Sequence, residues 1–266
     1  MHAIVCMKQV PDTTEVKIDP ERGTLIREGV PSIVNPFDTY AIEEALQLRE
    51  KFGGKVTVIT MGPPQAGEAL KEAVAMGCDE AILISDRAFA GSDTWATAYT
   101  LAQTIRRLGD FDVILCGKQA IDGDTGQVGP GVARQLGITQ LTYVFKVQEL
   151  DPDSGHIQVE RLLEEGREVV QSKLPALLTV VKDINQPRYP TFKGIRRASR
   201  MEIPTWTAGE LEGANAELFG LDGSPTRVVK VFNPPPRAGQ VELIDGDSPA
   251  EAAATLVDKL LAEKII

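Results

Sequence analysis

Apolar runs alternate with amphipathic segments through the first half of the chain, the pattern of a parallel sheet covered by helices. Short apolar runs predict buried strands at residues 3–7, 56–61, 81–85 and 113–116. Longer segments predict helices at residues 37–52, 66–76, 93–108 and 128–136. This order predicts an α/β protein with a Rossmann-like, doubly wound, mostly parallel sheet.

Turn and cap residues mark the ends of these elements. Asn35 is suited to cap the first helix, with Pro36 at its first position. Gly77 and Gly109 end the next two helices, and Gly77 suits a left-handed cap. Before the first helix, residues 16–18 and 24–26 flank the turn signal Asp-Pro-Glu-Arg-Gly, which predicts an inserted hairpin.

The pattern changes after Gly137. Runs rich in β-branched residues predict a β extension, with strands at residues 141–148, 157–162, 168–172 and 177–181. Residues 184–200 have no strong period and predict an extended excursion. Three prolines at 234–236 predict a stiff linker, followed by a C-terminal helix that starts at Ser248 with a capping box to Glu251. We expect a main domain over residues 1–232 and a linker with a helical arm over 233–266.

Composition narrows the class of protein. Hydrophobic residues make up 42% and charged residues 25% of the 266 residues, as in soluble globular proteins. The net charge of −10 argues against nucleic-acid binding, because phosphate contacts require a surplus of Lys and Arg. No apolar run approaches the ~18 residues of a membrane span, and the first residues begin a strand rather than a signal peptide. Cys6, Cys78 and Cys116 lack metal-ligand spacing, so we expect reduced thiols and a cytoplasmic protein.

The segment CGKQAIDGDTGQVGP, residues 116–130, joins a predicted strand to a predicted helix. Its glycines let the backbone approach a ligand without a Cβ in the way. The helix start offers amide donors and a positive dipole end to a phosphate, and Asp122, Asp124, Thr125 and Gln127 suit ribose or adenine. An acidic surface loop is the alternative, but ordinary strand–helix turns are much shorter.

Residues for hydrolytic chemistry are scarce. The histidines are His2, at the chain start, and His156, in a turn, so neither a Ser-His-Asp enzyme nor a histidine-bound metal is expected. No GxxxxGK phosphate loop is present, and no GxGxxG follows the first strand. The Ser-Gly-Gly-x-Asp-Ser loop of ATP pyrophosphatases is missing too, which argues against an adenylating enzyme. We expect a tightly held nucleotide, with no catalytic residue and no metal ligand.

Four ordered motifs resemble the beta (small) subunit of electron-transfer flavoproteins. They are VCMKQVPD at 5–12, VNPFDTYAIEEAL at 34–46, VTVITMGPP at 56–64, and the glycine-rich segment at 116–130. The resemblance implies that an adenine nucleotide contacts Cys6, Asn35, Pro36, Phe37, Asp38, Met61, Ala120, Ile121, Asp122, Gly123, Asp124, Thr125, Gly126, Gln127, Val128, Gly129, Pro130 and Gly131. For Cys6, Phe37 and Met61, a plain core position is the alternative.

The resemblance leaves two cofactors open. Conventional members carry structural AMP at this site, whereas bifurcating members carry a second FAD that accepts a hydride from NADH. The stretch ISDRAFAGSDT at 84–94 resembles bifurcating members, which implies that Arg87, Ser92 and Thr94 contact the flavin. An ion pair of Arg87 with Asp86 or Asp93 is the alternative. We place FAD ahead of AMP.

The resemblance also implies partners. The chain would form a heterodimer with an FAD-carrying alpha subunit, clasped by the C-terminal arm. It would pass electrons to ferredoxin or flavodoxin and to an acyl-CoA dehydrogenase or quinone reductase. The segment RYPTFKGIRRA at 188–198 resembles the family's partner-recognition loop, with Phe192 as anchor and Arg196, Arg197 and Arg200 as steering charges. Alternatively, Phe192 packs into the sheet and the arginines pair with carboxylates of the chain. A stand-alone ATP-binding module of the universal-stress type is the alternative function.

Overall fold

The computed structural model describes all residues except 13–16, 19–24, 27–30, 230–238 and 240. The chain divides into two compact units, Met1–Lys230 and Val231–Ile266, and each is described by itself. None of the described helices is long and apolar enough to cross a membrane. Cys6, Cys78 and Cys116 are buried free thiols, as predicted.

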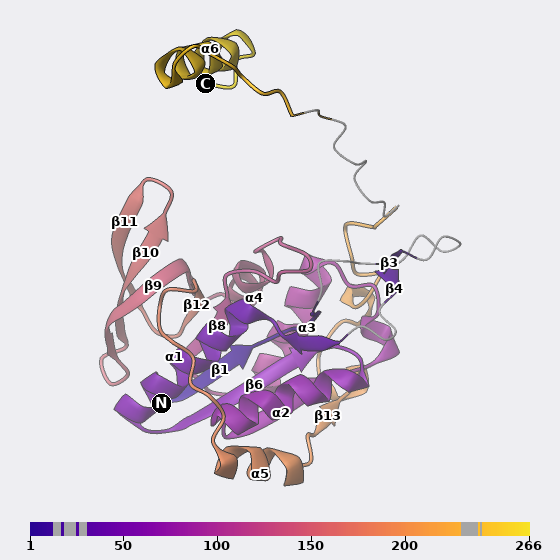
Figure 1. Ribbon diagram of the computed structural model, residues 1–266. Helices are drawn as coiled ribbons and strands as arrows, with labels where there is room; N and C mark the ends of the chain where they lie inside the picture. Colours follow the sequence, from indigo (N-terminus) through magenta and orange to yellow (C-terminus); the bar gives the residue numbers. More distant parts are fainter. Residues whose placement is uncertain (13–16, 19–24, 27–30, 230–238, 240) are drawn as a thin grey trace. The chain divides into compact units, whose positions relative to one another are not determined.

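A nine-stranded sheet runs through the first unit in the order β11-β10-β9-β12-β8-β1-β6-β7-β13 (Figure 1). Neighbouring strands from β9 to β13 are parallel, and β10 and β11 are added antiparallel at one edge. The strands are β1 (His2–Cys6), β6 (Lys55–Met61), β7 (Glu80–Ile84), β8 (Val113–Gly117), β9 (Thr139–Asp151), β10 (His156–Leu163), β11 (Gly166–Lys173), β12 (Ala176–Val180) and β13 (Thr205–Trp206). The predicted α/β class with a mostly parallel sheet is confirmed.

The strand predicted at 177–181 belongs to the parallel core of the sheet and not to the β extension. It forms β12, which pairs in parallel with β8 on one side and with β9 on the other. All its residues are buried. Its sequence ALLTV is apolar almost throughout, which is typical of a strand covered on both faces, and this signal could have indicated a place in the parallel core.

Helices cover both faces of the sheet. They are α1 (Pro36–Phe52), α2 (Gly67–Met76), α3 (Thr94–Leu108) and α4 (Val128–Leu136). The 3-10 turns η1 (Pro64–Ala66) and η2 (Arg87–Phe89) follow β6 and β7, whereas η3 (Ala208–Glu210) and η4 (Ala216–Leu218) follow β13. In β1, Ala3 and Val5 pack with α1 and α2, whereas Ile4 and Cys6 pack with α3 and α4. This alternation follows from the two-residue side-chain period of a strand, and it divides the core into two layers.

Two short antiparallel pairs lie outside the main sheet. Strand β2 (Gln9–Pro11) pairs with β5 (Ser32–Val34), and β3 (Lys17–Ile18) pairs with β4 (Leu25–Ile26). The second pair confirms the predicted hairpin, although its turn lies outside the described residues.

The segment predicted as an extended excursion contains a helix, α5 (Phe192–Arg200). Thr191 caps it by accepting the N–H of Gly194 at 3.0 Å. Gly194 lies so close to α2 that a Cβ there would stand 2.1 Å from the Ala75 carbonyl oxygen. The helix was missed because it is short and its face toward α2 uses glycine and Ala198 rather than large apolar residues.

The second unit contains α6 (Pro249–Ala262). Ser248 caps it, as predicted, because its hydroxyl accepts the N–H of Glu251 at 3.2 Å. The predicted capping box is incomplete: the Glu251 carboxylate accepts the N–H of Asp247 at 3.0 Å instead of that of Ser248. Within this unit Leu256, Val257 and Leu261 remain 45%, 45% and 54% exposed.

Candidate functional site

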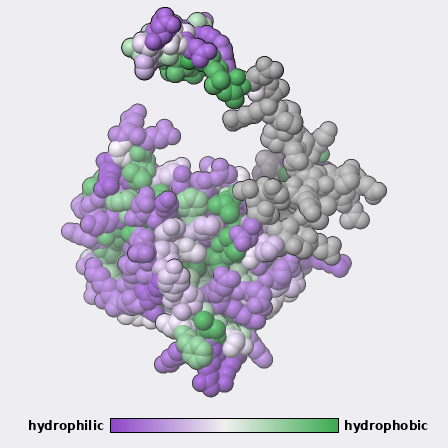
Figure 2. All heavy atoms as spheres, viewed as in Figure 1, coloured by the Kyte–Doolittle hydropathy of each residue, from purple (hydrophilic) through white to green (hydrophobic). Residues whose placement is uncertain are grey.

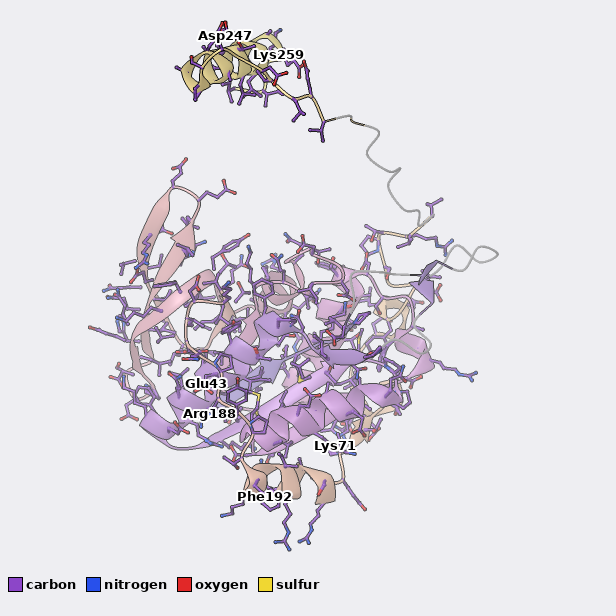
Figure 3. The ribbon with its side chains drawn as sticks, in the orientation of Figure 1. Glu43, Lys71, Arg188, Phe192, Asp247 and Lys259 are labelled. Carbon is purple, nitrogen blue, oxygen red and sulfur yellow. The ribbon has the colours of Figure 1, made fainter. Side chains whose placement is uncertain are left out.

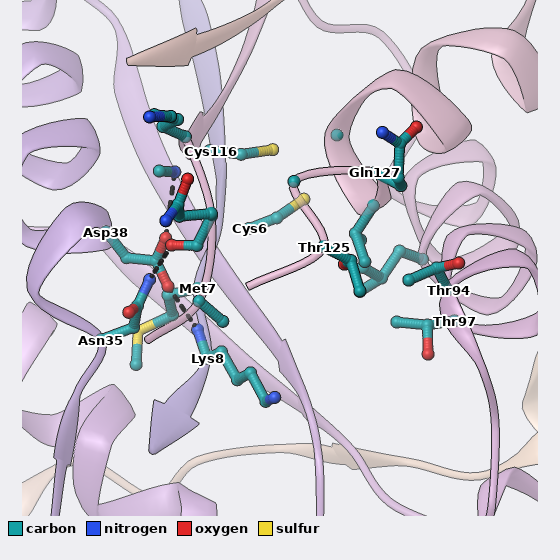
Figure 4. A pocket seen from close by; sticks show the side chains of 18 of the residues that line it. Cys6, Met7, Lys8, Asn35, Asp38, Thr94, Thr97, Cys116, Thr125 and Gln127 are labelled. Carbon is teal, nitrogen blue, oxygen red and sulfur yellow. Dashed lines mark hydrogen bonds between the residues drawn. The ribbon is translucent and has the colours of Figure 1, made fainter. Parts of the chain in front are cut away.

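A cavity of about 230 Å³ lies where the carboxyl ends of β1, β6 and β8 meet the start of α4 (Figure 4). In an open α/β sheet, this edge is where ligands bind. The cavity brings together many of the predicted site residues, namely Cys6, Asn35, Asp38, Met61, Thr94, Ala120, Thr125, Gly126, Gln127, Val128 and Gly129.

Asn35 ties the cavity to the glycine-rich segment. Its side-chain amide donates to the Gln119 carbonyl at 2.9 Å, and its side-chain oxygen accepts the N–H of Ile121 at 3.2 Å. Asn35 is the N-cap residue of α1 with Pro36 at the start of the helix, as predicted, but its side chain makes no cap bond to the helix. Asn35 is 1% exposed, so its polar side-chain atoms must find hydrogen-bond partners inside the protein. The distant glycine-rich segment supplies these partners in place of the helix amides.

Asp38 holds two strand ends together. One carboxylate oxygen accepts the N–H of Lys8 at 2.7 Å, and the other accepts the N–H of Gly117 at 2.9 Å (Figure 4). Gly117 is required here, because a Cβ would stand 2.4 Å from the Asp38 oxygen. Burial raises the pKa of Asp38 to about 7, against the opposing effect of hydrogen bonds from Lys8, Asn35 and Gly117.

Two thiols face the cavity side by side. Cys6 and Cys116 are register partners on β1 and β8, and their sulfur atoms point the same way (Figure 4). A hydrogen bond with Cys6, together with burial, raises the pKa of Cys116 well above its ordinary value. The Cys116 thiol is therefore un-ionised, and the two sulfur atoms form a soft, weakly polar wall of the cavity.

Gly129 and Gly131 pack α4 closely on its surroundings. A Cβ on Gly129 would stand 2.6 Å from Cγ2 of Thr179, and one on Gly131 would stand 2.8 Å from Cβ of Ala98. The sequence analysis attributed the glycines to backbone approach to a ligand. For these two positions the structure gives a packing reason. Replacing Gly129 with a bulky residue would therefore disturb the packing of α4 as well as any contact with a nucleotide.

A second cavity, of about 650 Å³, adjoins the first. The two share Lys8 and Met61 as lining residues. Arg87 and Asp122 line the second cavity, and the Lys8 ammonium bonds the Asp122 carboxylate at 2.7 Å. The two cavities therefore lie next to each other, and the Lys8–Asp122 ion pair joins a residue that lines both cavities to one that lines the second.

Of the three residues expected to contact the flavin, two line a cavity and one does not. Thr94 lines the first cavity and Arg87 the second, whereas Ser92 lines neither and donates its hydroxyl to the Phe89 carbonyl at 2.8 Å. Asp86 and Asp93 accept backbone N–H groups, and in the described part of the chain neither forms an ion pair with Arg87.

Several predicted residues line neither cavity: Pro36, Phe37, Ile121, Gly123, Asp124, Pro130 and Gly131. Conversely, Lys8, Thr97, Leu101 and Lys118 line the site but were not among the predicted site residues, and Gly117 was expected only as a glycine that lets the backbone approach a ligand. Lys8 stands within the VCMKQVPD motif and Lys118 within the glycine-rich segment, so the position in a motif could have revealed both.

The predicted partner segment exposes a large aromatic side chain. Phe192 is 86% exposed at the start of α5 and points away from the sheet (Figure 3). The surface in the region of α5 shows a small hydrophobic patch bordered by hydrophilic residues (Figure 2). Arg197 donates to the carbonyls of Val74 and Cys78 at the end of α2, so its charge is partly engaged within the chain.

Arg188 fixes the chain just before this segment. Its guanidinium lies 2.8 Å from Glu43 and 2.5 Å from Glu50, both on α1 (Figure 3). The Glu43 side chain is almost fully buried, which strengthens the pairing relative to an exposed ion pair.

Residues 22–211 match the family model described as Electron transfer flavoprotein domain. The chain belongs to the electron transfer flavoprotein family.

Relatives of this electron transfer flavoprotein chain extend the match to its whole length. The electron transfer flavoprotein subunit beta of Thermoanaerobacterium thermosaccharolyticum is 54% identical, over 100% of both chains. The caffeyl-CoA reductase-Etf complex subunit CarD of Acetobacterium woodii is 49% identical, over 100% of both. Protein FixA of Azotobacter vinelandii is 45% identical, over 99% of this chain and 95% of that protein. The resemblance to beta subunits is confirmed, and the chain is an electron-transfer subunit of the type that pairs with an alpha subunit.

Proposed function

We propose that the chain is the beta subunit of a bifurcating electron transfer flavoprotein. It binds FAD, receives a hydride from NADH, and passes one electron to the FAD of the alpha subunit and one to ferredoxin or flavodoxin. The electrons that reach the alpha subunit continue to an acyl-CoA dehydrogenase or quinone reductase. The observation that carries this proposal is the pair of adjoining cavities, because a dinucleotide occupies two compartments where AMP occupies one.

The residues of the first cavity suit the adenosine and phosphate part of FAD. Gln127 makes no side-chain cap at the start of α4, so the first amides of the helix remain available to phosphate oxygens. Lys8 adds a positive charge at the junction of the cavities. Asn35 and Asp38 act indirectly, since they hold the glycine-rich segment and the strand ends in position.

The second cavity suits the flavin ring. When bound there, FAD supplies the capacity to accept two electrons and release them singly. Met61 and Phe89 offer apolar contact, and Arg87 offers a positive charge that stabilises a reduced, anionic ring. The names of CarD, from a caffeyl-CoA reductase-Etf complex, and of FixA add support, because these relatives match over nearly the full chain.

A conventional subunit with structural AMP is the second candidate. The first cavity alone favours it, because that cavity has the residues for a mononucleotide. In this case the second cavity holds no part of the cofactor, and Arg87 has no role in electron transfer.

Cofactor content of the purified heterodimer tests the proposal. The proteins are denatured, and the released nucleotides are separated and quantified. Two FAD per heterodimer support the bifurcating assignment, and one FAD with one AMP contradicts it. Arg87→Ala should lower the FAD content from two toward one per heterodimer, because only the FAD of this subunit is lost. Arg134→Ala, on α4, is the matched control and should keep both.

A further inference from the structure

The stretch between β13 and the second unit packs back onto the loop that joins β7 to α3. Phe219 is 4% exposed, and its ring lies edge-on to Phe89 with centroids 5.0 Å apart. The Phe219 ring also lies 5.6 Å from Tyr99, whose hydroxyl accepts the N–H of Asn215 at 2.8 Å. These contacts anchor the stretch in the core layer that contains α3.

The two backbones touch directly at Gly220. Its φ is +59°, and a Cβ there would stand 2.3 Å from the Ala88 carbonyl oxygen. The next residue, Leu221, donates its N–H to the Ala90 carbonyl at 3.1 Å. Only glycine permits this approach, because both the space and the backbone conformation exclude a side chain.

Asp93 joins the loop to the end of the stretch. One carboxylate oxygen caps α3 by accepting the N–H groups of Trp95 and Ala96 at 2.9 and 3.1 Å. The other accepts the N–H and the hydroxyl of Thr226 at 2.9 and 2.8 Å. In return, the Asp93 N–H donates to the Ser224 hydroxyl at 2.8 Å. The carboxylate thus has four donors and links three segments.

This stretch supports the loop without lining the site. Arg87, Phe89, Ala90 and Gly91 line the second cavity, whereas residues 219–226, all of them described, line neither cavity. The contacts to Ala88, Ala90 and Asp93 therefore act on the shape of the loop and not on a ligand.

We propose that residues 219–226 form a clasp with Asp93 that positions the Arg87 loop, and that this clasp makes the site selective for a dinucleotide over a mononucleotide. The inference rests on the proposed function, in which the flavin half of FAD occupies the second cavity. The first cavity is built mainly by other loops, so loosening the clasp weakens binding of FAD and leaves binding of AMP nearly unchanged.

The test uses the double variant Ser224→Ala/Thr226→Val in the full-length chain. It removes two hydroxyl groups of the clasp but keeps Asp93, whose capping of α3 also positions Thr94 in the first cavity. Thr207→Val is the matched control, because the Thr207 hydroxyl bonds Glu210 elsewhere in the same part of the chain at 3.0 Å. The single variant Thr226→Ser, which keeps Ser224, should show the nucleotide affinities of the unaltered chain, because its serine hydroxyl can still donate to Asp93.

Dissociation constants for FAD and for AMP are measured by titration calorimetry, with amide exchange at Phe89 and Ala90 as a second readout. We expect the ratio of the FAD to the AMP constant to rise about 10-fold in the double variant, as for loss of charge-assisted hydrogen bonds, with faster exchange in the loop. An unchanged ratio, whether both affinities fall equally or neither changes, contradicts the proposed role of the clasp. Equal affinity of the unaltered chain for FAD and AMP instead contradicts the proposed function.

Discussion

At the scale of single residues, Asp38 has the most unusual environment in the site. Its carboxylate is 5% exposed and bonded to backbone groups of two different strand ends. The pKa rises from its ordinary value of 3.8 to about 7 because burial outweighs those bonds. Between these two values the folded chain holds one proton more than the unfolded chain, so the stabilisation present at low pH is lost as pH rises through 7.

Asp38→Asn should therefore change how stability depends on pH. From about pH 5 to pH 7, the free energy of unfolding of the unaltered chain should fall relative to that of the variant by about 1 kcal/mol per pH unit. Urea unfolding of both proteins across this range measures the difference. Asp151→Asn, in an exposed turn, removes the same charge and should give a curve parallel to that of the unaltered chain. Parallel curves for Asp38→Asn as well would contradict the raised pKa.

At the scale of elements, α5 has one side that packs on the rest of the chain and an opposite side that is exposed to solvent. Its inner side is fixed by the close approach of Gly194 to α2 and by the bonds of Arg197 to α2 carbonyls. Its outer side exposes Phe192 and Ile195, which are 86% and 52% exposed. A helix with this division can lose an outer side chain without losing its place, because exposed positions contribute little to folding.

Phe192→Ala should slow electron delivery to the dehydrogenase partner by about 10-fold or more, as for a central anchor of an interface. Cofactor content and the rate of reduction by the electron donor should stay unchanged. Stopped-flow mixing of the reduced heterodimer with the dehydrogenase measures the rate. Val169→Ala, an exposed apolar residue on β11, serves as the control. A loss of flavin or of the heterodimer in Phe192→Ala would identify a structural residue instead.

At the scale of the whole molecule, the chain consists of a large unit with its own core and a small unit whose described residues, 239 and 241–266, form none. No residue of α6 is buried, and its apolar residues at 256, 257 and 261 are about half exposed. A helix of 14 residues is marginal in water unless an apolar face is covered. We propose that the alpha subunit covers this face.

The double variant Leu256→Asp/Leu261→Asp should raise the dissociation constant for the alpha subunit by about 100-fold, since it places charge on a face that becomes buried. Thermal unfolding of the unit Met1–Lys230 should be unaffected. Analytical ultracentrifugation at several concentrations measures the association. Asp258→Ala, on the same helix, should leave it unchanged. An unaltered constant in the Asp double variant would show that α6 does not contribute to the heterodimer.

The sequence alone was enough to predict the order of elements in the wound part of the chain and the glycine-rich segment between β8 and α4, because both depend on local periodicity and on glycines near strand ends. It also determined the C-terminal helix and its Ser248 cap, which are local features. Tertiary structure decided the rest. The place of β12 depends on strand pairing, the helix α5 depends on packing against α2, and the side chain of Asn35 depends on a segment more than eighty residues away. Contacts between distant residues leave no period in the sequence, which is why the bonds of Asp93 to Ser224 and Thr226 emerged only from the fold.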